Sequence, residues 1–315
     1  MSYSFLRESK LYIVHCSGNG VKYRLYPSSA ITFNQTFAED SYSVKTLHDQ
    51  SKMFEQSIIN KANPADFSFD VSLTAEKNES ILLALAVDID GAIAAESDIE
   101  PQKLKEFDMY VQSGNTTWKI SRCFITSAVL DFIPDNPFTL RLEGQGTKLE
   151  RVGTQSYTIT SDSTFTESST RTPLIVYPSV TLGGTAVANI LSCNLQIQNN
   201  IEWIPYETLH NSLSVTDSSN AMFPIDYTLD KRIVSGEIRQ YHTNNNYNSH
   251  DDFSTNVALA ITGKKVSDNT DFFKITMDPA VFTSRLNPEE VYTTSYDFHS
   301  ADNTDTLGTQ ITVYS

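Results

Sequence analysis

The sequence predicts a mainly β protein built from two similar halves, and three observations lead to this prediction. Aromatic residues that suit strands are abundant, with 15 Tyr and 17 Phe in 315 residues, whereas few segments are rich in strong helix formers. Short motifs of the first half return in the same order in the second half. A Ser/Thr-rich stretch lies between the halves. We therefore expect two tandem, mainly β domains of similar organisation.

The boundary between the halves is the stretch from Thr154 to Thr170, in which eleven of 17 residues are Ser or Thr. This composition offers little to a hydrophobic core and is typical of a linker or an extended arm. We assign residues 1–153 to the first domain, 154–172 to the linker and 173–315 to the second domain. Domains of this size are common in globular proteins.

The formal net charge of −15 disfavours sequence-specific DNA binding, because an acidic surface repels the phosphate backbone. The three cysteines, Cys16, Cys123 and Cys193, form no CxxC motif, so neither a zinc site nor a disulfide framework is expected. No apolar run approaches about 18 residues, and the N-terminal residues lack a long apolar stretch. We expect a reducing compartment, no signal peptide and no membrane insertion by this chain.

Alternation of apolar and polar residues predicts strands at corresponding places in both halves. In the first half, the alternating segments are residues 30–35 (AITFNQ) and 66–75 (DFSFDVSLTA). In the second half, they are residues 193–198 (CNLQIQ) and 232–241 (RIVSGEIRQY). Each pair is separated by a long polar excursion, so we expect the paired strands to be joined by extended loops.

One short helix is expected after each pair of strands. Residues 79–87 (ESILLALAV) contain strong helix formers, and Asn78 is placed to cap them. Residues 249–259 (SHDDFSTNVAL) begin with a Ser cap and with acidic residues that suit a helix N-terminus, although Ser, Thr and Asn are weak helix formers. The sequence therefore predicts one helix in each half.

Each half closes with a strand, a proline-containing turn and a second strand, in residues 127–144 and 279–298. The turns contain Pro134 and Pro288, which are 154 residues apart. The other repeated motifs are separated by 155 to 169 residues. Because the motifs keep a common order, we interpret the chain as an internal duplication.

The motif TLH occurs at Thr46–His48 and again at Thr208–His210. A histidine beside a carboxylate suggests catalysis, and Asp49 follows the first copy. The second copy has Asn211 instead, and an amide does not replace a carboxylate in charge. We conclude that these histidines recur because the fold recurs.

No other group of residues predicts an enzyme, a metal site or a cofactor. His250, Asp251 and Asp252 are adjacent and would point in different directions on a helix. The acidic loop around Asp88 and Asp90 lacks the spacing of a calcium loop. Nucleophile-elbow, P-loop and dinucleotide-binding motifs are absent. We therefore expect no catalytic residues, no metal and no cofactor.

The order of a strand, a polar excursion, a returning strand, a helix and closing strands, present twice, resembles the major tail tube protein of long-tailed bacteriophages. The resemblance is to the form with two tube domains in one chain, and it covers nearly the whole sequence. It rests on domain order and on the internal repeat, and the same fold occurs in type VI secretion tube proteins. It implies two tandem tail-tube domains, each a β-sandwich or barrel with a flanking α-helix and a long stacking loop. It also implies that three chains form a pseudo-hexameric ring, and that stacked rings form a tube around a channel for DNA ejection.

The resemblance also implies partners and a location. The partners are further copies of the chain, the tape-measure protein, the tail terminator and distal tail proteins, and double-stranded DNA that passes without specific binding. The location is the tail of the virion, after synthesis in the host cytoplasm.

A channel would explain the polar face of the alternating strands, since small polar and acidic residues let a phosphate backbone pass without binding it. Arg239 departs from this pattern and would need an acidic neighbour such as Glu237. The alternative is a face that meets solvent in a monomer. The expected channel-lining residues are Thr32, Asn34, Ser68, Asp70, Ser72, Gln196, Gln198, Ser235 and Glu237.

The excursions at residues 36–64 and 199–230 are long for hairpin connections. The resemblance implies that they contact the neighbouring ring. The expected stacking-loop residues are Thr46, Leu47, His48, Thr208, Leu209 and His210.

Two alternatives stay open. The first is another tail component of the same fold, such as a terminator, a hub or a distal tail protein, which forms one ring. The second is a carbohydrate-binding β-sandwich on a virion, for which Tyr247 in a polar loop is the best aromatic candidate.

Overall fold

The computed structural model describes most of the chain, and nearly all of its regular structure is β, which confirms the prediction of a mainly β fold. The described residues are 9–15, 22–44, 54–74, 79–87, 104–114, 116–132, 136–152, 174–203, 223–224, 226–243, 255–300 and 309–313.

The regular elements fall on both sides of the Ser/Thr-rich stretch. Before it lie β1 (Lys10–His15), β2 (Lys22–Leu25), β3 (Thr32–Asn34), β4 (Phe37–Val44), β5 (Phe54–Ala62), β6 (Ala65–Ser72), α1 (Ser80–Val87), β7 (Phe107–Ser113), β8 (Thr116–Phe132), β9 (Thr139–Gly146) and β10 (Lys148–Arg151). After it lie β11 (Val176–Leu182), β12 (Thr185–Val187), β13 (Ile190–Trp203), β14 (Tyr227–Tyr241), β15 (Thr255–Lys265), β16 (Asp271–Asn287), β17 (Thr293–Ser300) and β18 (Thr309–Val313).

The two halves have the same order of neighbouring strands. The first half runs β2-β1-β7-β8-β9-β6-β3, and β10 pairs with β8. The second half runs β12-β11-β15-β16-β17-β14-β13, and β18 pairs with β16. All of these pairs are antiparallel. Among the described residues, each strand of the first half except β4 and β5 thus has one counterpart in the second. The domain limits at residues 153 and 173 remain a prediction.

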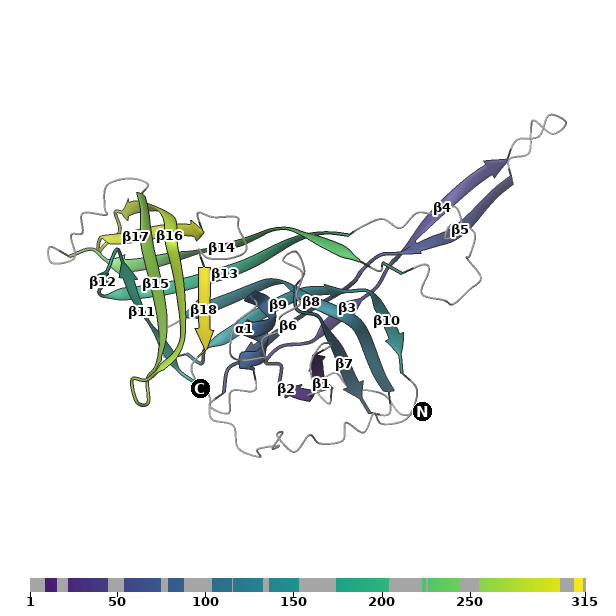
Figure 1. The fold of residues 1–315 in the computed structure, drawn as a ribbon, viewed down its shortest axis with the longest axis horizontal. Coiled ribbons are helices and arrows are strands. Elements are labelled where there is room, and N and C mark those ends of the chain that lie inside the picture. Colours follow the sequence, from purple (N-terminus) through teal and green to yellow (C-terminus); the bar gives the residue numbers. More distant parts are fainter. Residues whose placement is uncertain are drawn as a thin grey trace.

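The halves are joined through strands β8 and β13, which pair from Phe132 opposite Cys193 to Ser127 opposite Gln198. The sheet therefore continues from one half into the other without an edge between them. Figure 1 shows β15–β18 at one end of the molecule, β8 and β9 near its middle, and the β4–β5 hairpin projecting at the far end.

The core lies between two layers of this sheet. Phe67 of β6 contacts Phe107 of β7, with 6.0 Å between ring centroids, although β6 and β7 are not neighbours in the sheet. The sheet must therefore fold over and pack face to face, as in a β-sandwich. Strand β6 alternates buried and more exposed residues along its length, with Phe69 and Val71 pointing into the core.

The helix predicted in the first half is present. The prediction of a helix in the second half is wrong for the residues that the structure describes. Helix α1 spans Ser80–Val87, and its Leu82 and Leu83 are fully buried. In the expected second helix, the residues from Thr255 onward belong to strand β15. Burial alternates there, since Leu259 and Ile261 are buried and Ala258 is exposed, so the strand period overrides weak helix signals.

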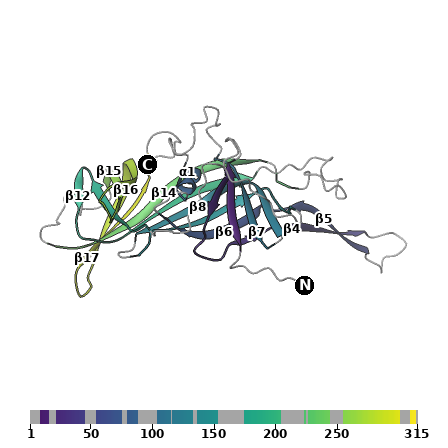
Figure 2. The same cartoon turned by 90° about the horizontal axis from the view of Figure 1, so that it is seen from below.

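The long excursion of the first half forms a hairpin. Strands β4 and β5 pair from Val44 opposite Phe54 to Phe37 opposite Ala62, and they form a sheet of their own. Figures 1 and 2 show this hairpin extending away from the main sheet in both views. The six expected stacking-loop residues, and the residues of the Ser/Thr-rich stretch, lie outside the described residues.

Candidate functional site: a polar face shared by both halves

The nine residues expected to line a channel lie on one face of the continuous sheet. In the first half, Thr32 is opposite Ser68, and Ser68 is opposite Glu143. Across the junction, Ser127 of β8 is opposite Gln198 of β13. Because opposite residues of an antiparallel pair share a face, the strand registers carry this face from β3 to β17. We name the face that contains these nine residues the polar face.

The strands order the polar face in rows that cross both halves. One row runs through Asp70, Arg141, Val129, Gln196, Ser235 and His299. The next row runs through Ser72, Thr139, Asp131, Asn194, Glu237 and Asp297. The nine residues predicted from sequence do not include the β8, β9 and β17 residues of these rows. The alternation of Leu140 and Leu142 with Arg141 and Glu143 was the signal that could have found those of β9.

The opposite side of the same strands is apolar and buried, which fixes the orientation of the polar face. Leu195 and Ile197 of β13 are fully buried, whereas Gln196 and Gln198 between them are exposed. Slipping a strand by one residue would expose its whole apolar set. The polar face is therefore specified by the same burial that stabilises the core.

Two arginines on the polar face lie beside carboxylates. Arg141 Nε lies 3.6 Å from Asp70 Oδ1. Arg285 Nη2 lies 2.7 Å from Asp297 Oδ2. Such pairing leaves these guanidinium groups less able to hold a passing phosphate.

Arg239 is paired as well, but with a different residue from the one expected. Its Nη2 atom donates to both oxygens of Glu289, at 2.5 and 2.6 Å, and its Nε atom donates to Thr293 Oγ1 at 3.3 Å. The prediction of Glu237 as its partner is therefore wrong. Glu289 follows β16 in the turn towards β17. The pairing of β14 with β17 brings this turn close to Arg239, although the two residues are far apart in the sequence.

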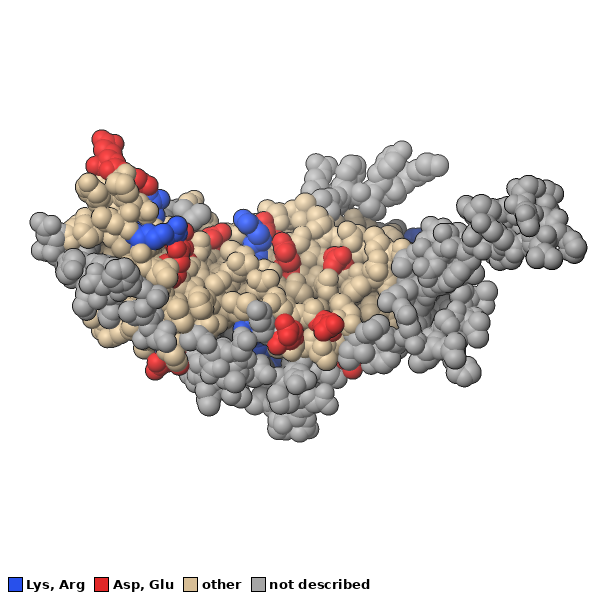
Figure 3. Space-filling view, turned by 90° about the horizontal axis from the view of Figure 1, so that it is seen from above, with Lys and Arg blue, Asp and Glu red and all other residues tan. Residues whose placement is uncertain are grey.

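Figure 3 shows how charge is spread over one side of the molecule. Several acidic side chains stand singly among uncharged residues, others gather at one end of the molecule, and basic side chains lie beside acidic ones in several places. An acidic surface on which the basic groups lie beside carboxylates repels an anion and offers it few places to bind.

A small aromatic cluster borders the polar face near strand β9. Phe124 contacts Tyr227 and Trp203, with centroid distances of 4.2 and 5.4 Å. Trp203 Nε1 donates to Gln145 Oε1 at 2.8 Å. The hydroxyl of Tyr227 donates to the Leu104 carbonyl at 3.1 Å, and burial raises the pKa of this hydroxyl. These polar atoms are engaged in hydrogen bonds within the fold, so the cluster has a structural character.

The comparison with known families agrees with this architecture. The model of the bacteriophage baseplate tube protein family matches residues 1–313.

The chain belongs to this family. No curated protein matches the chain. A member of this family is a structural component of a phage tail and hence of the virion. The match supports the phage-tail part of the resemblance, and its description names the baseplate tube and not the major tail tube. A member of this family assembles with other tail proteins.

The helices that the structure describes in this family member include none with the length and apolarity needed to cross a bilayer.

The buried thiol of Cys193 lies at the junction between the two halves, so its reactivity measures whether this junction is closed. Cys193 lies opposite Phe132 where β13 meets β8, and burial raises its pKa to about 12. In a Cys16→Ser background at pH 8, we expect Cys193 to be alkylated roughly 1000-fold more slowly than in the denatured chain, because the thiolate is the reactive form. Mass spectrometry of iodoacetamide-treated protein measures this rate. Alkylation of folded protein at the denatured rate would contradict a closed junction.

Proposed function

We propose that three copies of this chain form a pseudo-hexameric ring of the phage tail tube, and that the polar face of each chain lines a channel for DNA ejection. Its role in the particle is structural, without a catalytic step. In the baseplate region, such a ring would continue the tube towards the host. The proposal also covers stacking of rings into a longer tube.

The observation that carries the proposal is the continuity of the polar face through the β8–β13 junction. Two similar four-stranded units, β3-β6-β9-β8 and β13-β14-β17-β16, stand side by side in one sheet with the polar residues on one side. A sheet that repeats in this way can close on itself if further copies join in the same manner. Closure would also remove the open edges of the sheet.

The charges of the polar face suit the passage of double-stranded DNA. DNA carries one negative charge per roughly 1.7 Å of its axis, so a binding wall would slow it at every step. The acidic residues Asp70, Glu143 and Glu237 repel the backbone, and the arginines beside them are paired. Such a wall would favour sliding over binding.

The β4–β5 hairpin supports the stacking part of the proposal. It pairs with no other strand among the described residues, and it projects from the main sheet. A two-stranded hairpin is marginally stable alone, so a contact with the adjacent ring would stabilise it. Thr46–His48 would lie in this contact, and Thr208–His210 in the matching loop between β13 and β14.

The proposed partners are further copies of the chain, the tape-measure protein before ejection, and terminator or distal tail proteins at the ends of the tube. Double-stranded DNA would pass through without specific binding. A ring that closes without stacking would instead correspond to a terminator or hub.

Electron microscopy of the purified chain over a range of concentrations tests the proposal. We expect rings with three chains and a central channel wide enough for duplex DNA, and stacked rings at high concentration. Closed rings that never stack would favour the terminator or hub role. Protein that stays monomeric at every concentration, alone and with a tail initiator complex, would contradict the ring and favour a virion-decorating β-sandwich.

A further inference from the structure

The β4–β5 hairpin leaves the main sheet at a break that lies in both of its strands. The last pair of β3 with β6 is Asn34 opposite Asp66, and the first pair of the hairpin is Phe37 opposite Ala62. Between these pairs, two residues on one strand lie against three on the other. This is the arrangement of a β-bulge, which bends a pair of strands.

Backbone bonds across the break do not fix the angle between the hairpin and the sheet. Pro64 has no N–H group to donate to a strand ladder. The Asn63 N–H donates to the Thr36 carbonyl at 2.9 Å, and Asn63 Nδ2 donates to Thr36 Oγ1 at 2.8 Å. Both contacts join the two strands of the hairpin to each other, so contacts with the main sheet must set the angle.

The Gln35 side chain supplies such contacts. Its Nε2 atom donates to the Asn63 carbonyl at 2.8 Å and to the Thr147 carbonyl at 3.0 Å. Its Oε1 atom accepts from the Leu149 N–H at 2.9 Å. Both hydrogens and the oxygen of the amide are therefore used. One side chain thus connects the end of β3, the link between β5 and β6, and the corner between β9 and β10.

The corner that holds the Gln35 amide is attached to β8 of the main sheet. The N–H and the Oγ1 atom of Thr147 both donate to the Ser121 carbonyl, at 2.9 and 3.0 Å. Leu149 is opposite Ile120 where β10 pairs with β8. The hairpin is therefore connected through Gln35 to a strand in the middle of the sheet.

The second half uses an amide at the corresponding place. Strand β13 is the counterpart of β3, and Asn199 follows Gln198 of the polar face as Gln35 follows Asn34. The Asn199 amide also makes three hydrogen bonds, two to backbone carbonyls and one from Arg232. In each half, a fully used amide thus stands where the chain continues towards its long excursion.

We propose that Gln35 is the residue that positions the β4–β5 hairpin, and that its amide holds the hairpin at one angle to the sheet before a partner binds. The inference rests on the proposed function for the partner, which is a second copy of this chain in the adjacent ring. It deepens that function by naming the residue that directs the stacking contact. A segment that is already held in its bound orientation loses less freedom on association.

Amide hydrogen exchange of the isolated chain measures whether the Gln35 contacts hold. We expect Gln35→Leu to speed exchange of the Leu149 N–H at least about tenfold, because this N–H loses its acceptor. Gln35→Glu keeps an acceptor oxygen and should keep the Leu149 N–H protected. The N–H groups of Thr147 and Val152 donate to carbonyls of β8 and are internal controls, which should exchange at the parent rate in both variants.

Two exchange results would overturn the proposal. Equal exchange of the Leu149 N–H in the parent and in Gln35→Leu would mean that the side chain does not hold the corner. Faster exchange at Thr147 and Val152 as well would mean that Gln35 stabilises β10 as a whole and does not specifically position the hairpin.

Distances between spin labels measure the angle of the hairpin directly. In a Cys16→Ser background, labels at Ser57→Cys on β5 and Glu143→Cys on β9 report the hairpin against the sheet. The native Cys123 and Cys193 are buried and so are shielded from the reagent. With an excess of unlabelled chain, we expect one narrow distance distribution in the parent and a distribution at least about twice as wide in Gln35→Leu.

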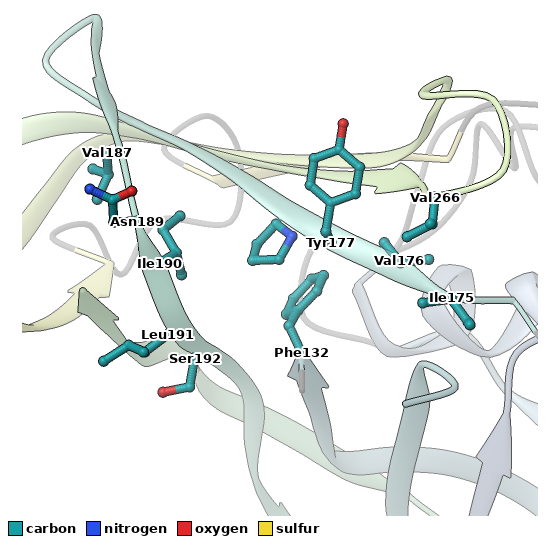
Figure 4. Close-up of a pocket in the computed structure, with 11 residues that line it drawn as sticks. Phe132, Ile175, Val176, Tyr177, Val187, Asn189, Ile190, Leu191, Ser192 and Val266 are labelled. Atoms are coloured by element: carbon teal, nitrogen blue, oxygen red, sulfur yellow. The ribbon is translucent and has the colours of Figure 1, made fainter. Parts of the chain in front are cut away.

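Two controls accompany this measurement. Labels at Glu143→Cys and Ser192→Cys report a distance within the sheet, which Gln35→Leu should leave unchanged. Ser192 is exposed, and Figure 4 shows it on β13 with its hydroxyl directed away from Phe132. The matched substitution is Gln198→Leu, because Gln198 is an exposed glutamine of the same sheet, and it should leave the hairpin distribution narrow.

The outcomes separate this inference from the proposed function. A widened hairpin distribution in Gln35→Leu, with rings that stack only at a roughly tenfold higher concentration, supports both. A widened distribution with unchanged stacking supports the positioning role and overturns the hairpin as the stacking contact. An unchanged distribution overturns the positioning role, whether or not rings form.

Discussion

Phage that carries Asp70→Lys together with Glu237→Lys is expected to lose infectivity by roughly tenfold or more, because added cations along the channel would bind the DNA backbone. At Asp70 the substitution also removes the carboxylate that lies 3.6 Å from Arg141, which leaves the Arg141 guanidinium without this partner. The loss should be partly reversed at higher ionic strength, which weakens phosphate contacts. Plaque counts and the rate of DNA ejection at several salt concentrations measure the effect.

Two controls separate channel chemistry from assembly defects. Glu150→Lys with Asp271→Lys makes the same change in net charge on β10 and at the start of β16, away from the polar face. The pair Asp70→Asn with Glu237→Gln removes charge without reversing it. Both control phages should infect almost normally. Unchanged infectivity of the lysine phage, with normal tails by electron microscopy, would exclude the polar face as the channel wall.

Replacing Asn199 with leucine is expected to destabilise the chain by about 3–5 kcal/mol, because several buried polar groups lose a partner at once. Asn199 is 2% exposed and lies on β13. Its Nδ2 atom donates to the Ala86 carbonyl at 3.0 Å and to the Ile125 carbonyl at 2.8 Å, and its Oδ1 atom accepts from Arg232 Nε at 3.0 Å. The carbonyl of Ala86 is in the last turn of α1, where no intrahelical donor is available.

Thermal unfolding checks this expectation. A loss of this size lowers the melting temperature of a chain this long by roughly 10 °C. Gln196→Leu is the control on the same strand, since Gln196 is exposed and its replacement should change stability by less than about 0.5 kcal/mol. Similar melting temperatures for the two variants would mean that Asn199 does not hold α1 against β8 and β13.

The faces of the strands could be predicted from sequence because burial acts on every second residue. Leu195 and Ile197 alternate with Gln196 and Gln198, and the register keeps that order through the sheet. All nine residues expected on the polar face were found on it, whereas their role as a channel wall stays a proposal.

Other features depend on contacts between residues far apart in the sequence. The partner of Arg239 is Glu289, fifty positions away, and no local pattern indicates it. The segment from Phe37 to Val44 was expected to be loop because it is polar, and it pairs with β5 without joining the main sheet. The helix expected near Thr255 failed because capping residues were weighed above the alternation that follows them.

The pairing of β8 with β13 has a consequence for how dilution affects assembly. Every association of free molecules loses translational and rotational freedom, at a cost of about 4–15 kcal/mol. Each chain already contains one junction between its two halves, the pairing of β8 with β13. A ring of such chains must therefore form only the junctions between chains by collision. The junction inside the chain instead forms at the millimolar effective concentration that is typical of tethered partners. Half of the junctions between successive tube domains in the ring would thus be independent of how much protein the infected cell has made.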